Sequence, residues 1–89
     1  MSESTEDATV LVVDDEKEVA DVYALRLRDE FDTETAYGGE AALDAIGDGD
    51  GIDVVLLDRR MPGVSGDEVL QTIRERGVDC RVIMITAVD

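Results

Sequence analysis

Hydrophobic residues in this chain fall into short runs that are separated by segments with helical spacing. Three runs, residues 10–13, 52–57 and 82–85, are almost purely aliphatic, and only Asp53 interrupts them. Such runs suit strands that are buried on both faces, as in a parallel sheet covered by helices. A fourth run, residues 31–37, alternates between apolar and polar positions instead. This alternation predicts an exposed strand at the edge of the sheet.

Two segments between these runs have the spacing of amphipathic helices. Residues 16–30 place Val19, Tyr23 and Leu27 four positions apart, flanked by Ala20 and Ala24, which predicts that these side chains form one apolar stripe of a helix. Residues 39–46 predict a second, shorter helix. Each of these helices lies between two predicted strands.

A third helix is predicted from its end signals. Ser65 and Glu68 have the spacing of a capping box, and Gly77 is a plausible C-terminal stop. The predicted order is therefore β-α-β-α-β-α-β. Strict alternation of this kind is typical of an α/β fold with a doubly wound parallel sheet.

Composition limits the classes of function. The 89 residues suit one small domain, and 23 Asp and Glu against 8 Lys and Arg give a formal charge of -15. This charge disfavours direct binding to nucleic acid or to a membrane. Cys80 is the only cysteine and there is no histidine, so most zinc and haem chemistry is excluded, and a reducing compartment is expected. We expect a cytoplasmic location and a disordered acidic tail over residues 1–8.

Polar residues stand at the end of each aliphatic run. Asp14 and Asp15 follow the first run, Asp58 follows the second and Thr86 follows the third. If the strands are parallel, these residues meet at one edge of the sheet, where open α/β sheets bind ligands. Clustered carboxylates repel one another and therefore favour a bound cation, and oxygen ligands suit Mg²⁺. With Mg²⁺ bound, a remaining carboxylate can act as a nucleophile toward phosphorus.

Each of these residues also has a structural interpretation. Asp15 can cap the first helix, Asp58 can be a turn residue, and Thr86 can simply end a strand. Arg59 and Arg60 are interpreted as surface charges. The Asp and Gly residues at 47–51 do not match the ligand register of an EF-hand calcium loop, so a solvated loop is expected there.

Four sequence motifs together resemble those of receiver domains from two-component response regulators. They are VVDDE at residues 12–16, AYGGEAAL at 36–43, VLLDRRMPG at 55–63 and IMITA at 83–87. The resemblance extends over nearly the whole chain from Thr9. It implies a flavodoxin-like fold, whose strand order is already known from a receiver protein.

The resemblance also implies roles for individual residues. Asp58 would accept a phosphoryl group from a sensor histidine kinase, and the domain would switch a downstream effector that the sequence does not identify. Thr86 would contact the phosphoryl group, and Ala87 would leave space for it. The implied Mg²⁺ ligands are Asp14 through water, Asp15, Asp58 and the backbone carbonyl of Arg60.

A complete receiver domain continues beyond the motif that ends at Ala87. We therefore expect residues 9–89 to be a receiver domain truncated after its fourth strand, without the fifth strand and the last two helices. The only lysine in the chain is Lys17, so the phosphate-binding lysine of the family has no counterpart. In the alternative, a naturally short form is stabilised as a dimer through the exposed edge of the strand at residues 82–85.

Two other functions compete with phosphoryl transfer to Asp58. A phosphorylation-independent interaction module is consistent with the missing lysine. A phosphatase of the haloacid dehalogenase type is disfavoured, because it needs a second aspartate two residues after the nucleophile, where Arg60 stands. Apart from self-catalysed transfer to Asp58, no enzymatic activity is expected. The acidic composition, with one lysine among the eight basic residues, also resembles the surfaces of proteins from halophiles.

Overall fold

Strands and helices alternate along the chain in the computed structural model, which describes residues 8–47 and 51–85. The elements are β1 (Thr9–Val13), α1 (Lys17–Leu27), β2 (Asp32–Ala36), α2 (Gly39–Ile46), β3 (Val54–Asp58), α3 (Gly66–Glu75) and β4 (Arg81–Ile85). The predicted α/β order is confirmed. The tail expected at residues 1–8 and the solvated loop expected at residues 47–51 lie outside the described residues, apart from Ala8, Gly47 and Gly51.

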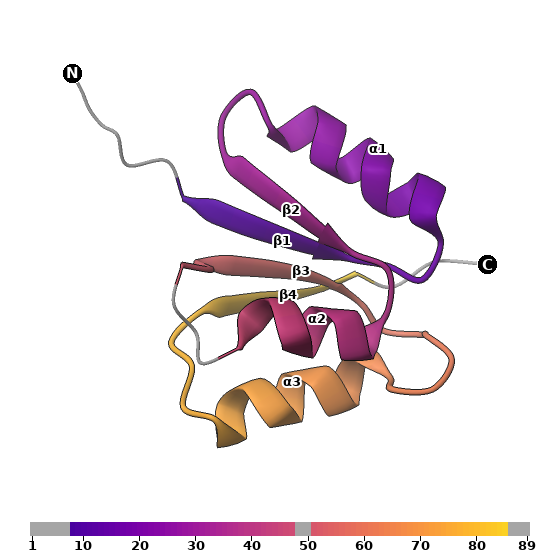
Figure 1. Ribbon diagram of the computed structural model, residues 1–89, viewed down its shortest axis with the longest axis vertical. Helices are drawn as coiled ribbons and strands as arrows, with labels where there is room; N and C mark the ends of the chain where they lie inside the picture. The colour runs from indigo at the N-terminus through magenta and orange to yellow at the C-terminus, as the bar shows by residue number, and fades with distance from the viewer. Residues whose placement is uncertain (1–7, 48–50, 86–89) are drawn as a thin grey trace.

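The four strands form one parallel sheet in the order β2-β1-β3-β4. The helix α1 covers one face of the sheet, and α2 and α3 cover the other (Figure 1). β2 lies at an edge, as its alternating pattern predicts, and residues 32–35 alternate between exposed and half-buried, whereas Ala36 is buried. The chain passes from β2 across β1 to β3, so the strand order reverses between β1 and β3.

The central strand β1 contributes to two hydrophobic cores. Leu11 and Val13 face α2 and α3, while Val10 and Val12 face α1. The larger core also contains Val55, Leu57, Val69 and Ile73, all of them fully buried. Four of the five residues of β1 are therefore buried, which explains the aliphatic run at this position.

The predicted apolar stripe of α1 is wrong in part. The side of α1 that packs on the sheet consists of Ala20, Ala24 and Leu27, and only Ala20 is fully buried. Val19 is half-buried, and Tyr23 remains 36% exposed. Because Ala20 and Ala24 take the positions that face the strands, Val19 and Tyr23, one residue before each of them, lie to the side of that face.

The expected ends of α3 are confirmed. The Ser65 hydroxyl accepts a hydrogen bond from the Glu68 amide at 3.2 Å, and the Glu68 carboxylate accepts one from the Ser65 amide at 2.9 Å. Gly77, which follows the helix, has a φ of 73°, a value that L-residues with a side chain rarely adopt. Local sequence therefore determines where α3 begins and ends.

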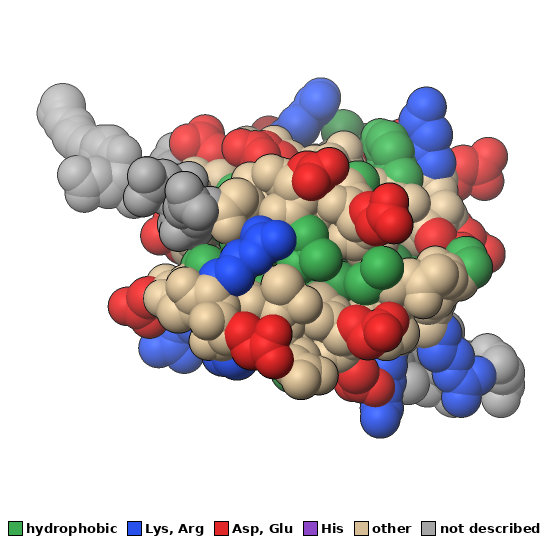
Figure 2. Space-filling model, turned by 60° about the horizontal axis from the view of Figure 1, so that its bottom comes forward, with side chains coloured by type: hydrophobic (Ala, Val, Ile, Leu, Met, Phe, Trp, Pro, Cys, Tyr) green, Lys and Arg blue, Asp and Glu red, His purple; other side chains and the backbone are tan. Residues whose placement is uncertain are grey.

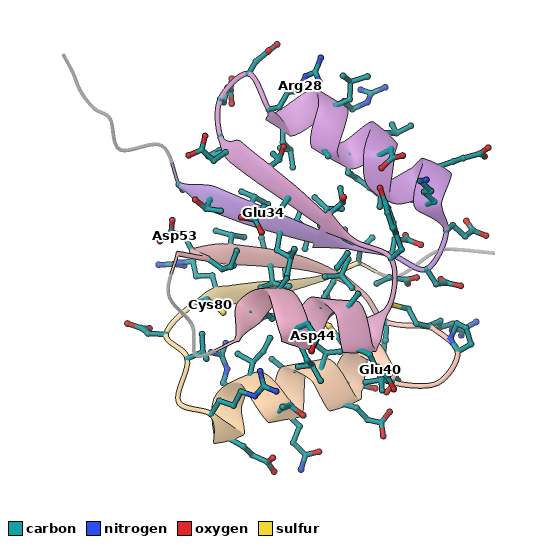
Figure 3. The ribbon with its side chains drawn as sticks, viewed as in Figure 1. Arg28, Glu34, Glu40, Asp44, Asp53 and Cys80 are labelled. Carbon is teal, nitrogen blue, oxygen red and sulfur yellow. The ribbon has the colours of Figure 1, made fainter. Side chains whose placement is uncertain are left out.

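The acidic residues are spread over the surface rather than gathered in one place. Figure 2 shows carboxylate side chains scattered across one face, with hydrophobic side chains exposed between them. Glu40 and Asp44 lie one turn apart on α2, and Asp53, near the start of β3, lies well away from both (Figure 3). Most of the formal charge of -15 thus comes from exposed groups, which repel one another diffusely over the surface.

The stability of the chain should rise strongly with salt, because salt screens this repulsion. We expect the Tm to increase by about 10 °C between roughly 0.05 M and roughly 2 M KCl, followed by circular dichroism. A variant with Asp29→Asn, Glu30→Gln and Asp32→Asn, all at exposed positions, should have a smaller salt dependence. A Tm that does not change with KCl would contradict this explanation.

Candidate metal site

Three carboxylates converge where β1 and β3 end. β1 and β3 are parallel neighbours, so Asp14, just after β1, and Asp58, the last residue of β3, lie at the same edge of the sheet. One carboxylate oxygen of each of Asp14, Asp15 and Asp58 lies within 4.8 Å of the others. The convergence predicted from the strand ends is therefore confirmed for these three residues.

Backbone hydrogen bonds hold two of these carboxylates in place. The Asp14 amide donates to the Ala36 carbonyl at 3.1 Å, and the Asp14 carboxylate accepts from the Glu16 amide at 2.9 Å. The Asp58 carboxylate accepts from the Arg60 amide at 3.2 Å. Asp58 is thus a turn residue as well as a member of the cluster.

Asp15 does not cap α1. The residue at the N-cap is Glu16, and it makes no side-chain capping hydrogen bond. The carboxylate that accepts from the Glu16 amide belongs to Asp14. Asp15 is exposed, and its carboxylate lies beside the other two.

The electrostatics of the cluster are unfavourable without a cation. Burial raises the pKa of Asp58 above its ordinary value of 3.8. The hydrogen bond from the Arg60 amide lowers this pKa, while the negative charges of Asp14 and Asp15 raise it further. A hard divalent cation would remove this repulsion, and a set of carboxylate oxygens suits Mg²⁺.

The cluster opens into a cavity of about 350 Å³. The lining residues are Asp14, Asp15, Glu16, Val19, Tyr23, Asp58, Arg60 and Ile85. Val19 and Tyr23 were not predicted at this site. Val19 and Tyr23 stand four and eight residues after Asp15, and this spacing was the available signal, because it places them in line along α1 after the acidic loop at residues 14–16.

The segment after β3 is held close to the strand by Gly66. The Gly66 amide donates to the Arg59 carbonyl at 3.0 Å, and a Cβ atom on Gly66 would overlap the carbonyl oxygen of Asp58. Arg59 also forms an exposed ion pair with Asp67 at 3.5 Å. The interpretation of Arg59 as a surface charge is consistent with this exposure.

The chain belongs to the response regulator receiver domain family, whose model matches residues 10–89. A protein of Haloferax volcanii described as a transcriptional regulator is 60% identical over 81 residues. The transcriptional regulatory protein CutR of Streptomyces coelicolor is 49% identical over 79 residues. The matches cover 90% and 88% of this chain but only 14% and 36% of the two relatives.

Solved receiver structures have the same fold. The response regulator TrrA of Thermotoga maritima, in complex with Mg²⁺ and BeF, has a TM-score of 0.83 and 38% identity, and the match covers 92% of this chain and 71% of TrrA. The N-terminal domain of a receiver protein from Methanoculleus marisnigri has a TM-score of 0.80 and 37% identity, and the match covers 90% and 67% of the two chains. The predicted flavodoxin-like receiver fold is thereby confirmed for the four strands and three helices of the described residues.

These relatives also agree with two broader expectations. The chain is a receiver domain of a two-component response regulator, which is a signalling domain rather than a classical enzyme. A relative from Haloferax volcanii fits the expected halophilic composition.

Among residues 8–47 and 51–85, no helix is both long enough and apolar enough to cross a membrane. Thr86 and Ala87, the other two candidate site residues, lie outside the described residues.

Replacing Gly66 by alanine should disturb the site and the fold together. The new Cβ would meet backbone atoms, including the Arg59 Cα at 2.8 Å, so the segment after Asp58 must shift. We expect a loss of about 1 to 3 kcal/mol in the free energy of unfolding, measured by urea denaturation. Gly38→Ala is the matched control, because nothing lies within 4 Å of its added Cβ. Equal stability of the two variants would show that the close approach is unimportant.

Asp58→Asn should stabilise the metal-free protein at neutral pH. Because the pKa of Asp58 is raised on folding, the folded state holds the proton of the Asp58 carboxyl group more tightly than the unfolded chain does. The contribution of Asp58 to stability is therefore complete below pH 3.8 and is lost as the pH rises through the folded-state pKa. Ionised Asp58 then costs stability, and asparagine removes that cost.

Thermal melts in EDTA measure this effect. We expect the Tm of Asp58→Asn to exceed that of the wild type by about 5 °C near pH 7, and the difference to shrink near pH 4. Asp44→Asn, at an exposed position of α2, is the control for the loss of one negative charge. A lower Tm for Asp58→Asn than for the wild type at neutral pH would contradict the assigned cost.

Proposed function

We propose that this chain is a phosphoacceptor that takes a phosphoryl group onto Asp58 from a phosphohistidine of a sensor histidine kinase. The observation that carries the proposal is the cluster of Asp14, Asp15 and Asp58 at the crevice between β1 and β3. Metal-assisted phosphoryl transfer requires carboxylates that hold a cation. Carboxylates that repel one another without a cation favour its binding.

The proposed reaction is a displacement at phosphorus. A carboxylate oxygen of Asp58 forms a bond to phosphorus while the bond from phosphorus to the histidine nitrogen breaks, and the electron pair stays on the imidazole. The product is an aspartyl phosphate, which adds negative charge at the end of β3. The hydrogen bond from the Arg60 amide orients the Asp58 carboxylate for this attack.

Mg²⁺ is the proposed cofactor. Its ligands would be Asp15, Asp58 and the backbone carbonyl of Arg60, with Asp14 contributing through water. When bound, Mg²⁺ neutralises charge on the carboxylates and on the phosphoryl oxygens. The hydrogen bond from the Glu16 amide to Asp14 holds that carboxylate at the mouth of the cavity.

The proposed partners follow from the family and from the relatives. Histidine kinases are the phosphoryl donors of response regulators, and the two curated relatives are named as transcriptional regulators. TrrA was crystallised with Mg²⁺ and BeF, which supports Mg²⁺ as the cofactor here. We therefore propose a cytoplasmic switch that acts on a downstream effector, with no direct contact to nucleic acid or membrane by this chain.

Three finer assignments remain predictions. Thr86 is assigned to the phosphoryl contact, and Ala87 to the small position beside it. Pairing of two copies through β4 is the third. In the part of the chain that the structure describes, β4 is hydrogen-bonded to β3 alone, and Ile83 is 51% exposed.

Incubation with acetyl phosphate and Mg²⁺ tests the proposed function directly. We expect intact-mass spectrometry to detect a gain of one phosphoryl group on the wild-type chain, and none on Asp58→Asn. Because the transfer depends on the cation, EDTA should abolish the gain. Asp53→Asn is the matched control and should be modified like the wild type, because Asp53 lies at the opposite end of β3 from Asp58 and its carboxylate accepts from the Thr9 amide at 2.8 Å.

Two results would overturn this proposal. One is the absence of any mass gain in a sample whose melt shows a folded protein. The other is an equal gain in Asp58→Asn, which would place the modification elsewhere. The first result would favour the phosphorylation-independent interaction module.

A further inference from the structure

Tyr37, directly after β2, joins the edge of the sheet to the first turns of α1. Its hydroxyl donates a hydrogen bond to the Asp21 carboxylate at 2.7 Å and accepts one from the Thr35 hydroxyl at 3.3 Å. The Lys17 ammonium lies 5.5 Å from the centroid of the Tyr37 ring, within the range of a cation–π interaction. One side chain therefore contacts two residues of α1 that are one turn apart.

The start of α1 has one local side-chain contact, the hydrogen bond from the Glu16 amide to the Asp14 carboxylate. Its N-cap residue, Glu16, makes no side-chain capping hydrogen bond. Lys17, the first helical residue, follows the acidic loop that carries Asp14 and Asp15. The position of this loop therefore depends on contacts made from outside the helix.

The end of β2 holds the other side of the same loop. The Ala36 carbonyl accepts the hydrogen bond from the Asp14 amide at 3.1 Å, and Tyr37 is the next residue along the chain. Ala36 thus holds the acidic loop just before Asp15, and Tyr37 holds the start of α1 just after it. Repulsion among the three carboxylates tends to push this loop away from Asp58, and these contacts oppose that movement.

Core packing does not explain these contacts. The Tyr37 side chain remains 41% exposed, and Asp21 and Lys17 are also exposed. Tyr37 belongs to neither hydrophobic core. Its contacts instead join the first turns of α1 to the end of the edge strand β2.

We propose that Tyr37 is a positioning residue for the metal site: by holding the start of α1 against β2, it keeps Asp14 and Asp15 near Asp58. This inference rests on the proposed function, because it assigns Tyr37 a role in binding the cation of that site. A site whose ligands are held in place before the cation arrives binds it more tightly. Loss of the Tyr37 contacts with α1 therefore weakens the binding of Mg²⁺.

Isothermal titration of the full 89-residue chain with MgCl₂ tests the role of Tyr37. Tyr37→Phe keeps the ring beside Lys17 but removes the hydrogen bond to Asp21, and we expect the Kd for Mg²⁺ to rise about threefold. Tyr37→Ala removes both contacts, and we expect a rise of about tenfold. Neither change alters the net charge, so long-range electrostatics stay the same.

Two further measurements separate positioning from general stability. Val78→Ala is the control, because it removes buried, uncharged volume before β4, at the other end of the strands. It should lower the Tm and leave the Kd for Mg²⁺ unchanged, whereas Tyr37→Phe should change the Kd with little change in the Tm. Hydrogen exchange should also show faster exchange of the Glu16 amide in metal-free Tyr37→Phe than in the wild type.

The possible results distinguish this inference from the proposed function. If the wild type binds Mg²⁺ and Tyr37→Phe binds it equally well, the role of Tyr37 is wrong and the proposed function stands. An equal loss of affinity in Val78→Ala would also overturn the role of Tyr37, because stability alone would then explain the effect. If the folded wild type does not bind Mg²⁺, both the metal site and the role of Tyr37 are wrong.

Discussion

The parallel pairing of β1 with β3 is the constraint on which both the cores and the acidic site depend. β1 lies between β2 and β3, so its alternate residues must fill two separate cores, one under α1 and one under α2 and α3. The same pairing aligns the ends of the two strands and brings Asp14 beside Asp58. The reversal of strand order at this point opens the crevice in which the carboxylates meet.

The acidic cluster works against the stability of the metal-free fold. Burial and the neighbouring charges disfavour the ionised form of Asp58, and the exposed carboxylates over the rest of the surface add a diffuse repulsion. The structure counters this locally with backbone hydrogen bonds to Asp14 and Asp58 and with the close approach of Gly66. A small domain with two hydrophobic cores thus holds an unfavourable arrangement of charge in place. Binding sites commonly contain such unfavourable arrangements.

Local signals explain why so much of the fold was predictable. The aliphatic runs predicted β1 and β3 because strands buried on both faces cannot carry polar residues without cost. The run at β4 also predicted a strand, but none of its residues is fully buried and Ile83 is 51% exposed. The capping box of Ser65 and Glu68 acts within four residues, so it needs no tertiary context. The orientation of α1 was predicted less well, because alanines at Ala20 and Ala24 gave a weak signal beside the larger Val19 and Tyr23.

The sequence by itself determined the order of the elements, the strand ends at which the aspartates stand, and the excess of negative charge. Each of these follows from residue type and short-range spacing. Only the tertiary structure decided that Glu16, and not Asp15, is the N-cap of α1, that Tyr23 lines the acidic cavity, and that Tyr37 reaches Asp21. These features depend on how α1 packs against the sheet, which is decided by contacts between segments far apart in the chain.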